Sequence, residues 1–180
     1  FGELAPPQGP SYYMTFLHLA LPGVGGYYDS GHENPPGISP YSNKRPMIFL
    51  NVAALRPGLR AYESLVAHEL QHAVHWQADP TDEVWINEGL SVLASAQFEP
   101  DELLMQAFIA QPQTQLNVWP EETKATAPHY GAAGLLMEFL YANYSDKEKT
   151  LRALVRQPED GLDGISAYLA QQGFAQGWRD

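Results

Sequence analysis

Residues 62–76 (YESLVAHELQHAVHW) constrain this chain most, because they hold an H-E-x-x-H pattern inside an apolar run with helical spacing. Residues four apart on an α-helix project from one face, one turn above the other. His68 and His72 can therefore hold one metal ion together. H-E-x-x-H on a helix is a zinc motif in which the intervening glutamate, here Glu69, is the general base. We predict a zinc site on a helix over residues 61–77.

The composition and net charge of the chain exclude or disfavour several classes of protein. The 180 residues are 44% hydrophobic and 12% aromatic, which is typical of one globular domain with its own core. The net charge of −11 disfavours a nucleic-acid partner, since phosphate binding needs a positive surface. No run is long and apolar enough for a membrane span. Because the chain has no cysteine, a metal must be held by histidine and carboxylate.

The first residues indicate a chain whose N-terminus has been processed or trimmed. Phe1 is not an initiator methionine, and no basic and apolar leader pattern follows it. We therefore expect a processed or trimmed start, with any export signal, pro-segment or further domain upstream. Residues 1–11 are proline-punctuated and lack periodicity, which predicts an extended arm.

Two strands are expected before the helix. Residues 12–21 (YYMTFLHLAL) alternate partially and predict a strand in which His18 is half-buried with a hydrogen-bond partner, rather than a metal ligand. Residues 47–52 (MIFLNV) form a short, bounded apolar run and predict a second strand. The Pro- and Gly-rich segment between them predicts a long ordered loop, with a third strand among residues 27–38.

The same loop raises the question of a structural Ca²⁺ ion. Asp29, Glu33 and Asn34 carry oxygen ligands of the kind that calcium prefers, but their spacing does not match a calcium-binding loop. Solvated turn chemistry is the favoured interpretation, and calcium is the alternative.

After the first helix the pattern is mainly helical. Asp79-Pro80 ends that helix, and a second helix, capped by Thr81 or Asp82, is expected to reach Phe98. Three-to-four-residue apolar spacing predicts further helices, joined by a polar loop over 111–128. Their expected ranges are 102–110, 130–144, 146–155 and 164–172.

A third ligand is needed for a hydrolytic zinc site. Glu88 lies on the second predicted helix, and antiparallel packing across the short turn at residues 79–82 would bring it beside the histidine pair. The adjacent Gly89 is costly inside a helix, by about 0.8–1.0 kcal/mol relative to alanine, which predicts close packing there. His75 lies nearly two turns from His68, so we assign it to packing rather than to metal binding.

With H-E-L-Q-H, N-E-G-L-S and H-Y-G-A-A in this order, the chain resembles the gluzincin metallopeptidases, most of all bacterial secreted peptidases of the hyicolysin-like and immune-inhibitor-A-like kind. The matching motifs lie within residues 47–95 and 128–144. The resemblance implies that the metal is zinc, that His68, His72 and Glu88 are its ligands, and that Glu69 is the general base. It also implies a polypeptide substrate, a secreted or extracellular location, and residues 47–52 as the edge strand that binds an extended peptide.

The resemblance further implies a donor to the oxyanion from a later segment. Tyr130 and His129 are the candidates, and Tyr130 is favoured because a phenol stays a donor at neutral pH. Simple aromatic packing is the alternative. Metal-bound histidines usually pass their other N–H to a neighbouring acceptor, and four residues are open for that role: Glu63, Asp82, Asn87 and Ser91.

We therefore expect an α+β, zincin-like fold within a single domain over residues 1–180. Residues 1–78 would form a small mixed sheet with the active-site helix, and residues 79–180 a mostly helical half. The predicted function is zinc-dependent endopeptidase activity. The alternative is a catalytically inactive zincin-like binding domain, which the intact Glu69 disfavours.

Overall fold

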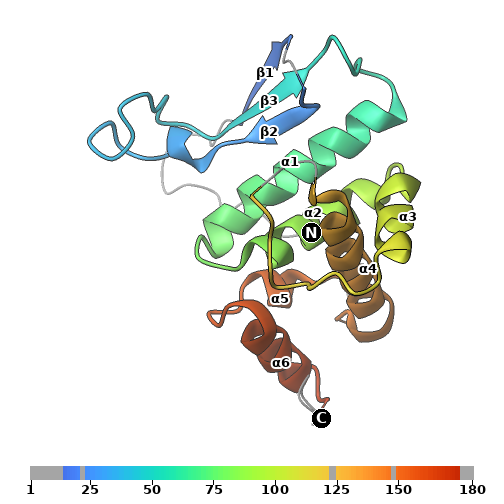
Figure 1. The fold of residues 1–180 in the computed structure, drawn as a ribbon. Coiled ribbons are helices and arrows are strands. Elements are labelled where there is room, and N and C mark those ends of the chain that lie inside the picture. Colours follow the sequence, from blue (N-terminus) through green and yellow to red (C-terminus); the bar gives the residue numbers. More distant parts are fainter. Residues whose placement is uncertain (1–13, 21–22, 122–124, 147–148, 175–180) are drawn as a thin grey trace.

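The computed structural model describes residues 14–20, 23–121, 125–146 and 149–174 (Figure 1). The predicted arm at residues 1–11 lies outside these ranges. The described chain has an α+β architecture, with a small mixed sheet on one side of a long helix and a group of helices on the other (Figure 1). The α+β fold class predicted from the sequence is confirmed. Each helix in the described ranges is too short or too polar to cross a lipid bilayer.

The sheet contains three strands: β1 (Thr15–Leu19), β2 (Gly26–Tyr28) and β3 (Met47–Asn51). Their order is β1-β3-β2, with β1 parallel and β2 antiparallel to β3. All five residues of β3 are buried, as expected of a continuous apolar run that is covered on both faces.

The expectation that residues 47–52 form an edge strand is therefore wrong. Strand β3 is the centre of the described sheet, because β1 and β2 take up the hydrogen bonds on its two sides. Strand β2, the third strand expected within the long loop, forms the edge instead. Strand order depends on pairing between distant segments, which periodicity alone does not encode.

The carboxylates of the long loop make hydrogen bonds within the loop and with α1 (Arg60–Ala78). Asp29 caps the short 3-10 helix Ser30–His32 by accepting from Gly31 N at 2.8 Å. Glu33 accepts hydrogen bonds from the Tyr28 hydroxyl and from Gln77 Nε2. These contacts account for both carboxylates as turn and loop chemistry, and the calcium alternative gains no support from them.

His18 differs in part from its prediction. It lies on β1 with its Nε2 2.8 Å from the Tyr62 hydroxyl, so the expected hydrogen-bond partner exists. The side chain is exposed rather than half-buried, because β1 is a sheet edge.

Helix α1 lies between the sheet and the remaining helices (Figure 1). Of the apolar residues spaced along one face of this helix, Ala73 and Val74 are buried, whereas Leu65, Val66 and Leu70 are only half-buried. The helix instead buries three polar side chains, Glu69, Gln71 and His75. The buried face of α1 is therefore more polar than the spacing of its apolar residues predicts.

Helix α2 (Val84–Ala96) packs antiparallel against α1. Ser64, early in α1, donates to the Ser95 carbonyl late in α2 at 3.1 Å, whereas the later His72 contacts Glu88. The predicted N-cap, Thr81 or Asp82, is wrong. The N-cap residue is Glu83, whose side chain makes no capping hydrogen bond. Asp82 instead faces His75 on α1.

Helices α3 (Glu102–Ala110) and α4 (Ala127–Tyr144) cover the other side of α2. Two glycines permit the close approach that the sequence predicted. A Cβ at Gly89 would lie 2.8 Å from the Ala133 carbonyl oxygen, and one at Gly131 would lie 2.1 Å from that of Leu104. Both distances are shorter than a carbon and an oxygen can tolerate, so α2, α3 and α4 pack backbone to backbone here.

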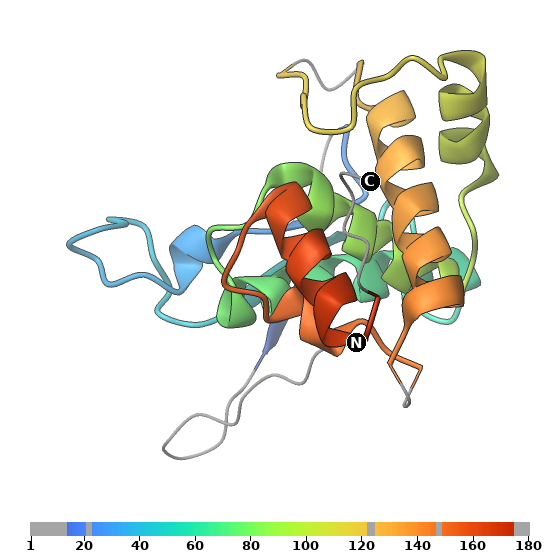
Figure 2. The same cartoon turned by 90° about the horizontal axis from the view of Figure 1, so that it is seen from below.

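Helices α5 (Arg152–Val155) and α6 (Gly161–Gln171) lie at the end of the molecule away from the sheet (Figure 1). Seen from below, α6, in red, lies in front of the other helices (Figure 2). The predicted helix over 146–155 is limited, in the described residues, to the four residues of α5; Asp146 instead accepts hydrogen bonds from Thr150. The core cluster draws on α2, α4, α5 and α6, and its fully buried members include Trp85, Ile86, Met137, Leu140, Ile165 and Tyr168.

Candidate metal centre

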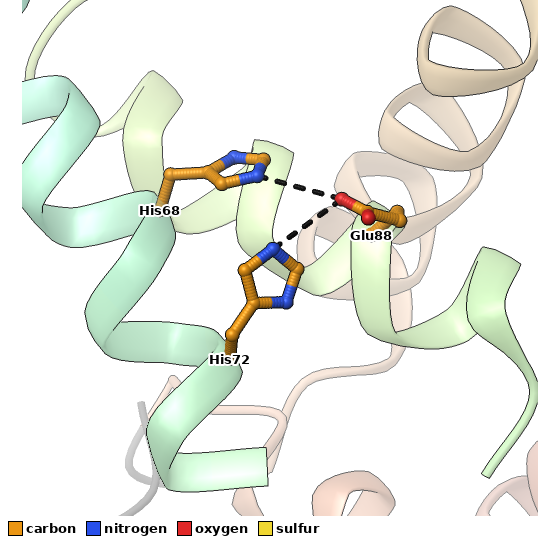
Figure 3. A group of neighbouring side chains, drawn as sticks. All are labelled: His68, His72 and Glu88. Atoms are coloured by element: carbon orange, nitrogen blue, oxygen red, sulfur yellow. Dashed lines mark ion pairs between the residues drawn. The ribbon is translucent and has the colours of Figure 1, made fainter. Parts of the chain in front are cut away.

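Helices α1 and α2 bring His68, His72 and Glu88 together (Figure 3). One ligand atom from each residue lies within 4.8 Å of the others, and this is the one such group among the described residues. Nε2 of His68 and Nε2 of His72 each lie 3.4 Å from Oε2 of Glu88. The helical spacing and the antiparallel turn thus produce the predicted three-residue cluster.

The donor set fits a metal ion. Oε2 of Glu88 is buried and has no hydrogen-bond partner. Leaving a buried carboxylate oxygen without a partner costs folding free energy, and a bound metal ion would supply that partner. The two imidazole nitrogens face the same oxygen, and two nitrogens with one carboxylate oxygen form a ligand set that zinc accepts. The His68–His72–Glu88 group can therefore hold a metal ion.

The orientation of His72 favours ligation through Nε2. Its Nδ1–H donates to Oδ1 of Asn87, and Nδ1 also lies 3.2 Å from the Ser91 hydroxyl. An acceptor at Nδ1 keeps the proton there and leaves the Nε2 lone pair for a metal. Two of the four open candidates thus contact a ligand. Asn87 and Ser91 are four residues apart on α2, so their side chains project from the same face of the helix. This spacing is a sequence signal that could have singled them out among the four candidates.

The other two candidates do not contact the group. Glu63 is exposed near the start of α1. Asp82 faces His75, its Oδ2 lying 3.3 Å from Nε2 of His75. His75 is fully buried and lies outside the metal-binding group, in line with its assignment to packing.

Charges within the cluster shift its pKa values strongly. Burial alone would raise the pKa of Glu88, but the two neighbouring histidines outweigh it and lower that pKa to about 2. Burial lowers the pKa of His72, and the neighbouring Glu88, Glu69 and Asn87 reverse this, so that its pKa is raised. Glu88 is therefore a carboxylate at neutral pH, as a ligand must be.

Glu69 lies beside the group and is 5% exposed. Burial raises the pKa of its carboxyl, and the charge of Glu88 adds to the rise; His68, His72 and a hydrogen bond from the Tyr28 backbone oppose it. A raised pKa makes this carboxyl a stronger proton acceptor than an ordinary glutamate. The backbone contact from β2 is a feature that sequence patterns did not reveal.

Tyr130 reaches the same site from α4. Its ring centroid is 6.4 Å from that of His68. Burial, followed by the charge of Glu88, raises its pKa, so the phenol keeps its proton at any physiological pH. Trp119 packs against both candidates, with its ring centroid 5.0 Å from that of Tyr130 and 5.8 Å from that of His129. The aromatic packing given as the alternative for Tyr130 is therefore also present.

Two cavities flank the metal-binding group. One, of about 620 Å³, is lined by His68, Glu69 and Tyr130 together with Gly25 and Gly26 at the start of β2. The other, of about 490 Å³, is lined by His72, Glu88 and Asn87 together with Tyr27 and Tyr28. Strand β2 therefore borders the cleft on both sides of the cluster.

Searches against protein-family models and against curated proteins found no match to this chain. The resemblance to gluzincins, which rests on three short motifs, stays a prediction. The site geometry is what supports a function.

Proposed function

We propose that this protein is a zinc-dependent endopeptidase of the gluzincin type. The observation that carries the proposal is the buried, unpartnered Oε2 of Glu88, 3.4 Å from Nε2 of both His68 and His72. These three residues would hold the ion. Zinc supplies a Lewis acid that activates water and polarises a carbonyl.

Glu69 is the proposed general base. Its carboxylate lines the larger cavity next to His68 and is shielded from solvent. It would take a proton from the attacking water and later deliver it to the amine that leaves the scissile bond. The raised pKa of Glu69 suits this exchange, because the carboxyl can hold the proton between the two steps.

Tyr130 is the proposed donor to the oxyanion. Its phenol stays protonated because its pKa is raised, and it lines the same cavity as Glu69. When substrate binds, the hydroxyl would donate a hydrogen bond to the developing negative oxygen. His129 is the less favoured candidate, since it lines neither of the two cavities.

Strand β2 is the proposed binding edge for the substrate. It borders both cavities and pairs with β3 on one side only among the described residues. An extended polypeptide can add to such an edge through backbone hydrogen bonds. This role replaces the one that the sequence assigned to residues 47–52. We also propose that the enzyme is bacterial and secreted, on the motif resemblance alone.

The test is metal analysis followed by peptide cleavage. We expect one zinc per chain and cleavage of a broad peptide library by the parent protein. Glu69→Gln should keep the zinc and lose about 10²–10⁴-fold in kcat, the range for loss of a general base. Glu63→Gln, an exposed change on the same helix, should leave kcat unaltered. Stoichiometric zinc without cleavage by the parent protein would instead favour a zincin-like binding domain.

A further inference from the structure

The contact between His75 and Asp82 is a buried polar feature that the proposed chemistry does not use. His75 is 0% exposed, and the Asp82 side chain is 8% exposed. Nε2 of His75 lies 3.3 Å from Oδ2 of Asp82. The distance is within ion-pair range, but neither ring nitrogen of His75 has a well-aligned hydrogen bond. A buried imidazole is thus held beside a buried carboxylate, at some energetic cost.

Stability does not explain such a pair. Removing a polar pair from water costs several kcal/mol per charged group, and well-packed apolar residues in its place are often neutral or more stabilising. The best-attested benefit of a buried polar contact is that it fixes how two elements align. His75 is one turn beyond His72 on α1, and Asp82 precedes α2, which carries Glu88. The pair therefore spans the two helices that carry the metal-binding group.

Asp82 joins three elements through one carboxylate. Its Oδ2 faces His75 on α1, while its Oδ1 accepts from Glu83 N at 2.7 Å, before α2, and from Gly161 N at 2.9 Å, at the start of α6. Asp82 also lines the 490 Å³ cavity together with His72 and Glu88. A change at this contact would be transmitted to the metal ligands along two short, rigid stretches of helix.

A metal site tolerates only small displacements of its ligands, about 0.5 Å, before affinity falls. The other end of the helix pair is joined by contacts of a weaker kind: Ser64 donates to the Ser95 carbonyl, and Arg60 Nη1 donates to the Phe98 carbonyl at 3.2 Å. Both are partly or fully exposed to solvent. The His75–Asp82 contact is the buried one, and it lies at the end of α1 nearer to His72.

We propose that His75 and Asp82 form a positioning pair that sets the alignment of α1 against α2, and thereby the metal affinity of the His68–His72–Glu88 group. The inference rests on the proposed metal site and not on peptide cleavage. Neither residue is a ligand or a catalytic residue. Both act through the histidines and Glu88.

The experiment measures zinc affinity by competition with a chelator, for the whole chain, at a temperature where circular dichroism finds each variant folded. His75→Leu should weaken zinc binding about tenfold, the lower end of the effect of outer partners on metal affinity. His75→Gln should restore most of the affinity, because its amide can donate to Oδ2 of Asp82. Asp82→Asn should weaken binding to a similar degree as His75→Leu.

Asp79→Asn is the matched control. Asp79 is a buried carboxylate in the same turn, but its Oδ1 accepts only from Thr81 N at 3.0 Å and Thr81 Oγ1 at 2.9 Å. We expect lower stability and unchanged zinc affinity for this variant. If Asp79→Asn weakens zinc binding as much as His75→Leu does, general loosening of the turn is the cause and the proposal fails.

Two further results would overturn the proposal: zinc affinity of His75→Leu equal to that of the parent, or equal weakening by leucine and glutamine. If His75→Leu does not fold, the comparison of Asp82→Asn with Asp79→Asn decides. A parent protein that binds zinc but cleaves no peptide would refute the peptidase proposal and leave this comparison intact.

Discussion

Helix α2 has two sides that follow opposite physical rules. Towards α1 it presents Asn87, Glu88 and Ser91, which meet histidines in a buried polar cluster. Towards α4 and α6 it presents Trp85, Ile86 and other apolar side chains, which join a core of fully buried residues. The polar side holds charge at a cost in folding free energy, and the apolar side offsets that cost by burying hydrophobic surface. The candidate metal site and the apolar core thus lie on different sides of one helix.

The largest expected effect tests the apolar side. Ile165 on α6 is 0% exposed within the core cluster, so Ile165→Ala should lower the free energy of unfolding by about 2–5 kcal/mol. Zinc affinity of the folded variant should not change. Ile109→Ala, the same chemical change at a residue 66% exposed on α3, should stay within about 0.5 kcal/mol. Loss of zinc affinity in Ile165→Ala would break the separation between the two sides.

A change on the polar side of α2 should affect zinc affinity much more than the free energy of unfolding. Glu88→Ala removes one of three proposed ligands, and zinc affinity should fall more than about 100-fold, beyond the 10–100-fold typical of outer partners. Without metal, the free energy of unfolding should fall by less than in Ile165→Ala, because the fold loses the contact of Glu88 with the two histidines that lowers the pKa of this carboxyl. Denaturation in a chelator and zinc competition measure the two quantities, with the exposed Glu138→Ala as the control. Zinc bound as tightly as by the parent would contradict the ligand assignment.

The smallest expected effect is a pH dependence of the free energy of unfolding that comes from Tyr168 in the apolar core. The Tyr168 hydroxyl donates to the Tyr144 carbonyl at 2.6 Å, and burial, aided by the charge of Asp146, raises its pKa from 10 to about 12. Above pH 10 the unfolded tyrosine ionises while the folded one does not, so unfolding becomes easier. The contribution is complete below pH 10 and is lost as the pH rises through about 12.

Urea denaturation between pH 9 and pH 11 measures this dependence. The parent should lose about 1 kcal/mol more than Tyr168→Phe over that interval, the maximum for one proton being about 1.4 kcal/mol per pH unit. At pH 7 the variant should be less stable by about 1 kcal/mol, the value of one hydrogen bond. Identical pH profiles would show that Tyr168 titrates normally in the folded core.

Local patterns predicted the helices well. The spacing of His68 and His72 and the Asp79-Pro80 break predicted α1 closely, because helix formation depends on residues three and four apart. The range of α3 was predicted without error, and α4 began three residues earlier than expected. Glu88 came within reach of the histidines because a short turn leaves two helices little choice but antiparallel packing.

Features that depend on distant segments were missed. The central place of β3 required pairing with β1 and β2 on its two sides, and no property of MIFLNV alone reports its neighbours. The helix expected over 146–155 was largely absent from the described residues because Asp146 bonds to Thr150 instead. The choice of Asn87 and Ser91 as partners of His72 depended on side-chain directions at the α1–α2 contact.

The sequence by itself identified the three residues of the candidate metal site, the glutamate between the histidines and the helices that carry them, since each depends on the short-range period of a helix. Only the tertiary structure decided which strand borders the cleft, that Tyr130 rather than His129 lines the cavity beside His68 and Glu69, and that Asp82 joins α1, α2 and α6. These contacts join residues far apart in the chain, and their distances are set by how whole elements pack.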